Sequence, residues 1–174
     1  YTGVTLADGT GPDGQPVPFF DGANDYNNIY SAAFNTDFDG AEGTALVWAR
    51  VNGSGVWTDG SDFQALRLEV DSSNHIYFRK APANNTFRLQ YVAGGTVDYY
   101  LHTTSSTGWM CYVMTWSATD DEIRYYRDGS GIATDSGLGV WAGNLDSTTT
   151  VIGAQDTIPL NPWHVWPGFL GDWS

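Results

Sequence analysis

The stretch GWMCYVMTWSATDDEIRYYRDG, residues 108–129, predicts two consecutive β-strands and the turn that joins them. Residues 109–116 are apolar at nearly every position, which is typical of a strand covered on both faces. Residues 122–127 alternate between apolar and charged or polar side chains, as a strand does when one of its faces meets solvent. Asp128-Gly129 then supplies a tight turn that needs positive φ. Together these features predict two packed β-layers.

The rest of the chain shows short strand patterns separated by turn signals, with almost no helical periodicity. Four consecutive runs alternate cleanly and are linked by short turns, which predicts an antiparallel meander with one polar side. These runs are residues 63–71, 75–81, 86–93 and 96–103. In the last run we expect Val97, Tyr99 and Leu101 to face the core, and Tyr100 to face solvent. A slip of one residue would reverse each of these assignments.

Three motifs, in order, resemble those of the laminin-G-like domains of the concanavalin A-like lectin/glucanase family. They are FFDGANDY at 19–26, GTALVWAR at 43–50, and the Trp-led strand that leads through a short turn to YRDG at 126–129. Cys111 departs from the pattern, because the family often has His at this position. The resemblance implies an all-β, antiparallel two-sheet jelly-roll sandwich over residues 19–174. Residues 1–18 are rich in Gly and Pro and are expected to form an extended arm or linker.

Composition limits the classes of function. A chain of 174 residues suits one domain with a core. Seven basic and twenty acidic residues give a net charge of −13, which opposes binding to nucleic acid. No apolar run approaches the ~20 residues that span a bilayer, so membrane insertion is not expected. The single cysteine, Cys111, excludes an internal disulfide and is expected to be a small buried residue.

The polar side of the meander is the first candidate site, and it carries most of the few cations. Sugars are bound by planar polar groups that fork onto hydroxyls and by aromatic rings that stack on C–H faces. The candidate ligand-binding residues are Arg67, Glu69, Tyr77, Arg79, Arg88, Gln90 and Tyr100, with Arg124 of a later strand expected to join them. The alternative is a solvated sheet face with cross-strand ion pairs.

Two tryptophans in loops extend this candidate site. Trp57 and Trp141 lie in Gly-rich segments, where exposure would make them sugar-stacking or partner-contact residues. The alternative is that these loops fold back and bury both rings.

Calcium is the candidate cofactor, on the basis of two clusters of oxygen ligands. Residues 35–40, NTDFDG, place oxygens at alternate positions and Gly at the sixth, as the first half of a calcium loop does. The candidate ligands are Asn35, Asp37, Asp39 and Glu42, and a second cluster contains Asp21 and Asp25. The resembled family often binds calcium near the sandwich edges. The alternative is that these side chains build Asx turns.

The catalytic motifs are incomplete. Glu69-Val70-Asp71 gives two carboxylates on one strand face, the arrangement that glycoside hydrolysis requires. The glucanases of the resembled family add a Glu two residues later, where this chain has Ser73. A polysaccharide lyase is disfavoured because the glutamine–isoleucine–histidine motif of the jelly-roll alginate lyases is absent. We therefore do not expect an enzyme.

The function that these observations favour is a non-catalytic binding module of a larger extracellular or surface-displayed protein, with carbohydrate as the ligand. The alternative is a structural, adhesion or decoration domain of a virion, tail fibre or surface filament that contacts other proteins. A glycoside hydrolase or polysaccharide lyase is third. The expected partner is accordingly a glycan or a surface protein, self-association into an oligomer stays open, and the expected location is extracellular, at the cell surface or on a virion.

Overall fold

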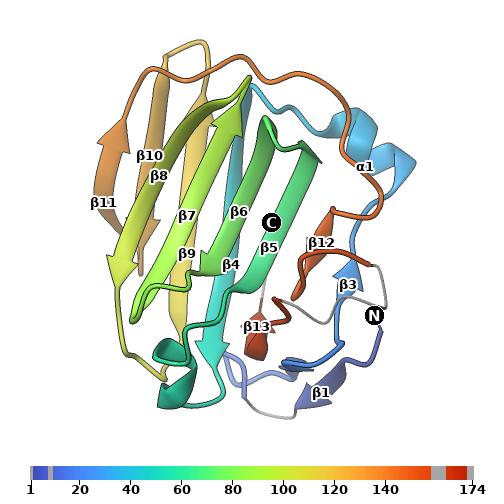
Figure 1. The fold of residues 1–174 in the computed structure, drawn as a ribbon, viewed down its shortest axis with the longest axis vertical. Coiled ribbons are helices and arrows are strands. Elements are labelled where there is room, and N and C mark those ends of the chain that lie inside the picture. The colour runs from blue at the N-terminus through green and yellow to red at the C-terminus, as the bar shows by residue number, and fades with distance from the viewer. Residues whose placement is uncertain (1, 8–9, 158–163, 172–174) are drawn as a thin grey trace.

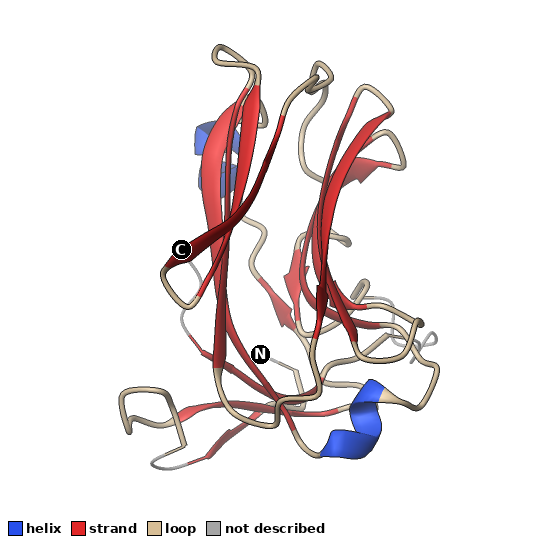
Figure 2. Ribbon diagram, turned by 90° about the vertical axis from the view of Figure 1, so that its left-hand side faces the viewer, coloured by secondary structure: helices blue, strands red, loops and turns tan. Residues whose placement is uncertain are grey.

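The structure is a computed structural model, which describes residues 2–7, 10–157 and 164–171. Two antiparallel sheets pack face to face as a jelly-roll sandwich, which confirms the predicted fold class (Figures 1 and 2). The seven-stranded sheet has the order β1 (Thr5–Ala7), β2 (Val17–Asp21), β13 (Pro167–Gly171), β4 (Glu42–Val51), β9 (Met110–Ser117), β10 (Glu122–Arg127) and β11 (Ser130–Asp135). The six-stranded sheet has the order β3 (Asn27–Asn28), β12 (Val151–Ile152), β5 (Phe63–Asp71), β6 (Asn74–Lys80), β7 (Thr86–Ala93) and β8 (Thr96–Thr103).

Helical structure is confined to short segments in the described residues. The helix α1 (Ala32–Asp37) begins at Ser31, whose hydroxyl oxygen accepts a hydrogen bond from the Phe34 amide at 3.0 Å. A 3₁₀ helix covers Ser54–Trp57. No helix among the described residues has the length and apolar character needed to cross a bilayer.

Aromatic side chains from both sheets form the core between the layers. The ring of Phe87 on β7 stacks on Tyr112 of β9 with 4.2 Å between centroids, and Trp166 meets Phe87 edge-on. All three are fully buried. Such contacts across the two layers contribute more than the buried area alone, by about 0.5–1.5 kcal/mol per pair.

The strand and turn of the opening stretch are confirmed, with one correction. Asp128 and Gly129 have φ of 49° and 80°, so the predicted turn does use positive φ. However, β9 is covered on both faces only over its first residues. Val113 and Thr115 are partly exposed, because no layer covers the outer face of the seven-stranded sheet at these positions.

The meander is confirmed as β5 to β8, but the orientation of β8 is the reverse of the prediction. Val97, Tyr99 and Leu101 face outward and are about half exposed, whereas Tyr100 faces the other sheet. The reason is the two-residue turn between β7 and β8, which fixes Leu89 opposite Tyr100. Since paired residues share a face, the buried Leu89 carries Tyr100 inward with it.

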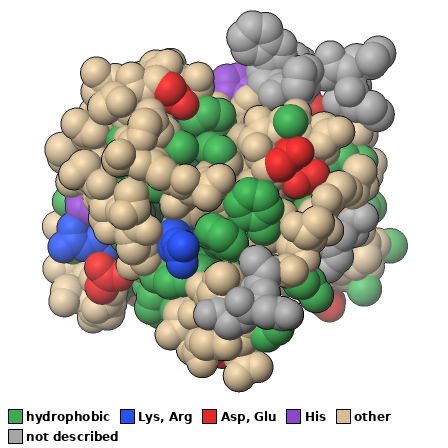
Figure 3. Space-filling view, turned by 90° about the horizontal axis from the view of Figure 1, so that it is seen from below, with side chains coloured by type: hydrophobic (Ala, Val, Ile, Leu, Met, Phe, Trp, Pro, Cys, Tyr) green, Lys and Arg blue, Asp and Glu red, His purple; other side chains and the backbone are tan. Residues whose placement is uncertain are grey.

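Part of the N-terminal segment, which was expected to form an extended arm or linker, pairs with the sandwich. Strand β1 pairs with β2 through Thr5 and Phe19, at the edge of the seven-stranded sheet. The indole Nε1 of Trp109 donates to the Thr10 carbonyl at 2.6 Å, which attaches the following loop to β9. Seen from below, the end of the molecule near these elements shows hydrophobic side chains among scattered charged ones (Figure 3).

Candidate ligand-binding face

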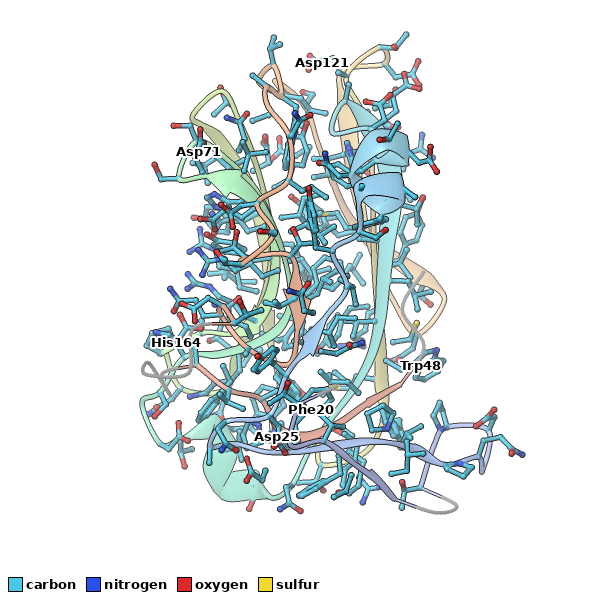
Figure 4. The ribbon with its side chains drawn as sticks, turned by 90° about the vertical axis from the view of Figure 1, so that its right-hand side faces the viewer. Phe20, Asp25, Trp48, Asp71, Asp121 and His164 are labelled. Atoms are coloured by element: carbon cyan, nitrogen blue, oxygen red, sulfur yellow. The ribbon has the colours of Figure 1, made fainter. Side chains whose placement is uncertain are left out.

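The candidate site is the outer surface of the six-stranded sheet, the surface toward the viewer in Figure 1. Viewed from the side, nitrogen- and oxygen-bearing side chains project from this sheet between Asp71 and His164 (Figure 4). We define the polar face by the side chains that make it up. These are Asp62, Arg67, Glu69, His75, Tyr77, Arg79, Arg88, Gln90 and Tyr99.

Strand register arranges this face in rows across the sheet. One row runs Arg67, Tyr77, Gln90 and Tyr99, because each is the partner of the next on β5, β6, β7 and β8. In the row next to it, Arg79 lies directly opposite Arg88. Period-two alternation on four neighbouring strands therefore places these side chains on one surface.

Tyr77 is the centre of the first half of the face. Its hydroxyl donates to Glu69 Oε2 at 2.5 Å, and Arg67 Nε donates to the same oxygen at 2.7 Å. The ring is stacked on His75 with 4.0 Å between centroids, and the Arg67 guanidinium lies 5.0 Å from its centre. Burial raises the pKa of Tyr77 well above its usual value, with help from the bond to Glu69. The phenol is thus held protonated and fixed.

His75 is the neutral member of this half. Burial lowers the pKa of His75, because desolvation disfavours the imidazolium. The Gln90 amide Nε2 lies 2.8 Å from the His75 Nε2 and donates to it in the neutral tautomer that carries its proton on Nδ1. That Nδ1 is buried and has no hydrogen-bond partner among the described residues.

The second half of the face contains two arginines in different surroundings. Arg79 forms an ion pair with Asp62, a carboxylate that His164 also approaches. Burial raises the pKa of Asp62, and the attraction of Arg79 offsets part of this effect. The guanidinium of Arg88 instead lies over the ring of Tyr99, 4.3 Å from its centre.

Several polar atoms of the polar face are buried without a partner among the described residues. They are Asp62 Oδ1, His75 Nδ1, Arg79 Nε, Arg88 Nε and Gln90 Oε1. A buried donor or acceptor that stays unsatisfied costs about 1–3 kcal/mol. Five of the nine such atoms among the described residues belong to the polar face, so unsatisfied hydrogen-bonding capacity is concentrated there.

The structure brings together six of the candidate ligand-binding residues, and four fall elsewhere. Those brought together are Arg67, Glu69, Tyr77, Arg79, Arg88 and Gln90. Tyr100 packs inward with its ring 5.8 Å from that of Tyr125. Arg124 lies on β10 of the other sheet, where it pairs with Glu122.

For the two loop tryptophans the sequence left exposure and burial open, and the structure shows burial. Trp57 is completely buried, and its Nε1 donates to the Ser106 carbonyl at 2.8 Å. Trp141 is partly buried against Phe38 and Tyr91, with ring centroids 5.6 and 5.9 Å away. The loops fold back over the core, which removes both rings from the candidate site.

The polar face also contains residues that the sequence prediction left out, namely Asp62, His75 and Tyr99. Tyr99 was assigned to the core from the alternation of β8 alone. The Gly94-Gly95 turn, with φ of 53° and 82°, was the signal that could have placed it. A two-residue hairpin fixes the register between β7 and β8. The register then decides which β8 side chains point outward, because paired residues lie on the same side of the sheet.

The described residues contain no assembled set of ligands for the predicted calcium sites. The Asp39 and Asn35 side chains accept from the backbone amides of Ala41 and Leu145 at 2.8 Å. Asp21 and Asp25 likewise accept from amides of their own turn. Among the described residues no three His, Cys, Asp or Glu side chains are grouped to hold a metal ion. Asp21 and Asp39 accept from the amide two residues ahead, as in Asx turns, and calcium stays a prediction.

Both carboxylates of the Glu69–Asp71 pair are engaged in hydrogen bonds within the protein. Glu69 is occupied by Arg67 and Tyr77, as described above. Asp71 accepts from the Ser73 amide at 2.8 Å, and this bond lowers the pKa of Asp71. A lowered pKa suits a nucleophile or base but not a general acid, so Asp71 is not suited to the role of the acid.

No protein-family model matches this sequence, and no curated protein matches it. Solved structures resemble it in fold. The binding domain of botulinum neurotoxin serotype D has a TM-score of 0.63 and 12% identity, covering 98% of this chain and 42% of its own. The fold is a concanavalin A-like jelly roll.

Two further solved structures also resemble this chain in fold. Domains LG4-5 of the mouse laminin alpha1 chain give a TM-score of 0.55 at 12% identity, covering 79% of this chain and 36% of theirs. The CBM40 of the Ruminococcus gnavus IT-sialidase gives 0.57 at 9% identity, covering 85% and 84%. This chain thus spans less than half of the toxin and laminin structures. At such identities the likeness establishes the fold alone.

Proposed function

We propose that this chain is a non-catalytic carbohydrate-binding module and that its polar face binds the glycan. The observation that carries the proposal is the grouping on one sheet surface of fixed aromatic rings, Tyr77 and Tyr99, with guanidinium and amide groups whose buried atoms lack partners. Aromatic faces and planar polar groups are what sugar recognition needs. The shared fold with a sialidase CBM40 is consistent with this function.

The setting follows from the same proposal. The module is part of a larger extracellular or surface-displayed protein, at the cell surface or on a virion, and its partner is a glycan or a surface protein. The net charge of −13 is consistent with this setting, because it disfavours nucleic acid and anionic lipid.

A glycan array followed by calorimetry tests the proposal. Neutral and acidic oligosaccharides are screened with and without calcium. Tyr99→Ala is expected to weaken binding about tenfold, the loss of one aromatic stacking contact. Arg124→Ala serves as the control, since Arg124 is exposed on the other sheet. Absence of binding across a broad array contradicts the proposal.

A second function, contact with another protein chain, is favoured by one observation. The edge strand β8 presents Val97, Tyr99 and Leu101 outward, each about half exposed. Exposed edge strands and apolar patches are sites of association. Mass photometry that finds a stable oligomer, lost in Leu101→Lys, would favour this function over glycan binding.

A small hydrolase or lyase is the third function. Reducing-sugar release from a polysaccharide, abolished in Glu69→Gln, would establish it. The pairing of Glu69 with Arg67 and Tyr77 argues for the opposite result, namely no release by either protein.

A further inference from the structure

Arg79 and Arg88 form an unusual cross-strand pair on the polar face. They are direct register partners on β6 and β7, and like charges directly opposite one another destabilise a sheet. Asp62 neutralises Arg79. Arg88 has no carboxylate partner within 4 Å among the residues that the structure describes, and its contact is the ring of Tyr99. The pair thus carries an excess of one positive charge in an acidic protein.

The hydrogen bonding of the pair is also incomplete. The Nε atoms of Arg79 and Arg88 are both buried and lack a partner within the described part of the chain, and so does the Oε1 of the adjacent Gln90. Burial lowers the pKa of Arg88, and the neighbouring Arg79 lowers it further. Burial and mutual repulsion therefore both disfavour the two charged guanidinium groups at this position. Such an arrangement is typical of a binding surface.

We propose that Arg79 and Arg88 form a subsite for an oxyanion substituent of the bound glycan, a carboxylate or a sulfate, with Tyr99 stacking on the sugar ring that carries it. The inference rests on the proposed function and names the class of glycan. A guanidinium presents a planar fork of donors that matches the oxygens of either group. An anion at this position neutralises the charge left over after Asp62 has paired with Arg79.

The overall charge of −13 does not prevent this binding. At physiological ionic strength the Debye length is about 8 Å, so charges farther away on the surface are largely screened. The local pair decides the affinity, whereas the acidic surface slows the approach of an anionic glycan. Binding of the acidic ligand should therefore depend on salt concentration in a way that binding of a neutral ligand does not.

The experiment compares three oligosaccharides of equal length by calorimetry at low and physiological salt. They are a neutral galacto-oligosaccharide, an oligogalacturonate and a sulfated galacto-oligosaccharide, so the last two distinguish carboxylate from sulfate. We expect at least one acidic ligand to bind tenfold or more tightly than the neutral one. In Arg88→Gln we expect this preference to disappear, because the acidic ligand should lose at least tenfold more affinity than the neutral ligand loses.

Two further variants make the result specific. Arg88→Lys retains the charge but not the fork, and it should lose most of the preference. Arg124→Gln removes the same charge from the other sheet and should leave the preference unchanged. Melting curves check folding, and Arg88→Gln is expected to melt close to the wild type, because relief of the repulsion from Arg79 offsets the loss of the stacking on Tyr99.

The outcomes separate this inference from the proposed function. If the neutral ligand binds and neither acidic ligand binds more tightly, the subsite is refuted and the carbohydrate-binding function stands. Equal losses in Arg88→Gln and Arg124→Gln also refute it, since they would indicate only a general effect of charge. If none of the three ligands binds and the glycan array is silent, the proposed function fails and the inference fails with it.

Discussion

Replacing Tyr99 and Tyr100 one at a time by Ala tests which side of β8 faces the core. The Tyr100 ring packs inward against Tyr125, and we expect its loss to lower the free energy of unfolding by about 2 kcal/mol, below the 3–5 kcal/mol of a fully buried aromatic. Tyr99 is 49% exposed, and its stacking with Arg88 is worth about 0.5–1 kcal/mol. Tyr99→Ala should therefore cost about 1 kcal/mol or less.

Urea unfolding followed by tryptophan fluorescence measures both values. In thermal unfolding, the same difference corresponds to a fall of about 4–8 °C for Tyr100→Ala and about 2–4 °C at most for Tyr99→Ala. Leu101→Ala is the control, because Leu101 shares the outward side and is 47% exposed. A larger loss for Tyr99→Ala than for Tyr100→Ala would refute the orientation of β8 and remove Tyr99 from the polar face.

Three further changes test other parts of the structure. Asp59→Asn should lower the free energy of unfolding by about 2 kcal/mol, because it removes the carboxylate that pairs with the fully buried Lys80 ammonium and leaves the Ser61 carbonyl and the Phe63 ring as its contacts. The usual cost is larger, but Asp59 is partly exposed. Lys80→Met in the same chain should abolish the effect in a double-mutant cycle. Burial lowers the pKa of His75, so as pH falls the unfolded chain takes up a proton before the folded protein does. The free energy of unfolding should therefore decline below about pH 6.5 by up to about 1.4 kcal/mol per pH unit, and His75→Gln should reduce this slope. A urea midpoint that does not change with pH would contradict the prediction. Trp57→Ala should lower the free energy of unfolding by about 3–5 kcal/mol, measured by the same urea titration. A near-neutral result would mean that the ring is exposed, the other alternative that the sequence left open.

Local patterns were sufficient to predict the architecture. Alternation in residues 63–93 placed Arg67, Tyr77 and Arg88 on one side of a meander, and the structure confirms this placement. The turn at Asp128-Gly129 was also predictable, because few residues other than Gly, Asn and Asp adopt positive φ at low cost. These features depend on neighbours in sequence, and a single chain reveals them.

The site residues that the sequence could not place have one property in common. Their burial depends on what lies across the sandwich. The sequence around Trp57 and Trp141 looks like exposed loop, yet both rings contact residues distant in the chain, among them Ser106 and Tyr91. Arg124 alternates correctly on its own strand but belongs to the other sheet. No local pattern contains this information.

The sequence by itself determined the two-layer β fold, the approximate extent of the meander strands and the polarity of three of them, because side-chain alternation and turn chemistry are short-range properties. Only the tertiary structure decided that Arg79 and Arg88 meet as register partners, with Tyr99 stacked on Arg88. Register is fixed by hydrogen bonding between strands and by the turn that joins them, and the face of an edge strand follows its neighbour rather than its own composition.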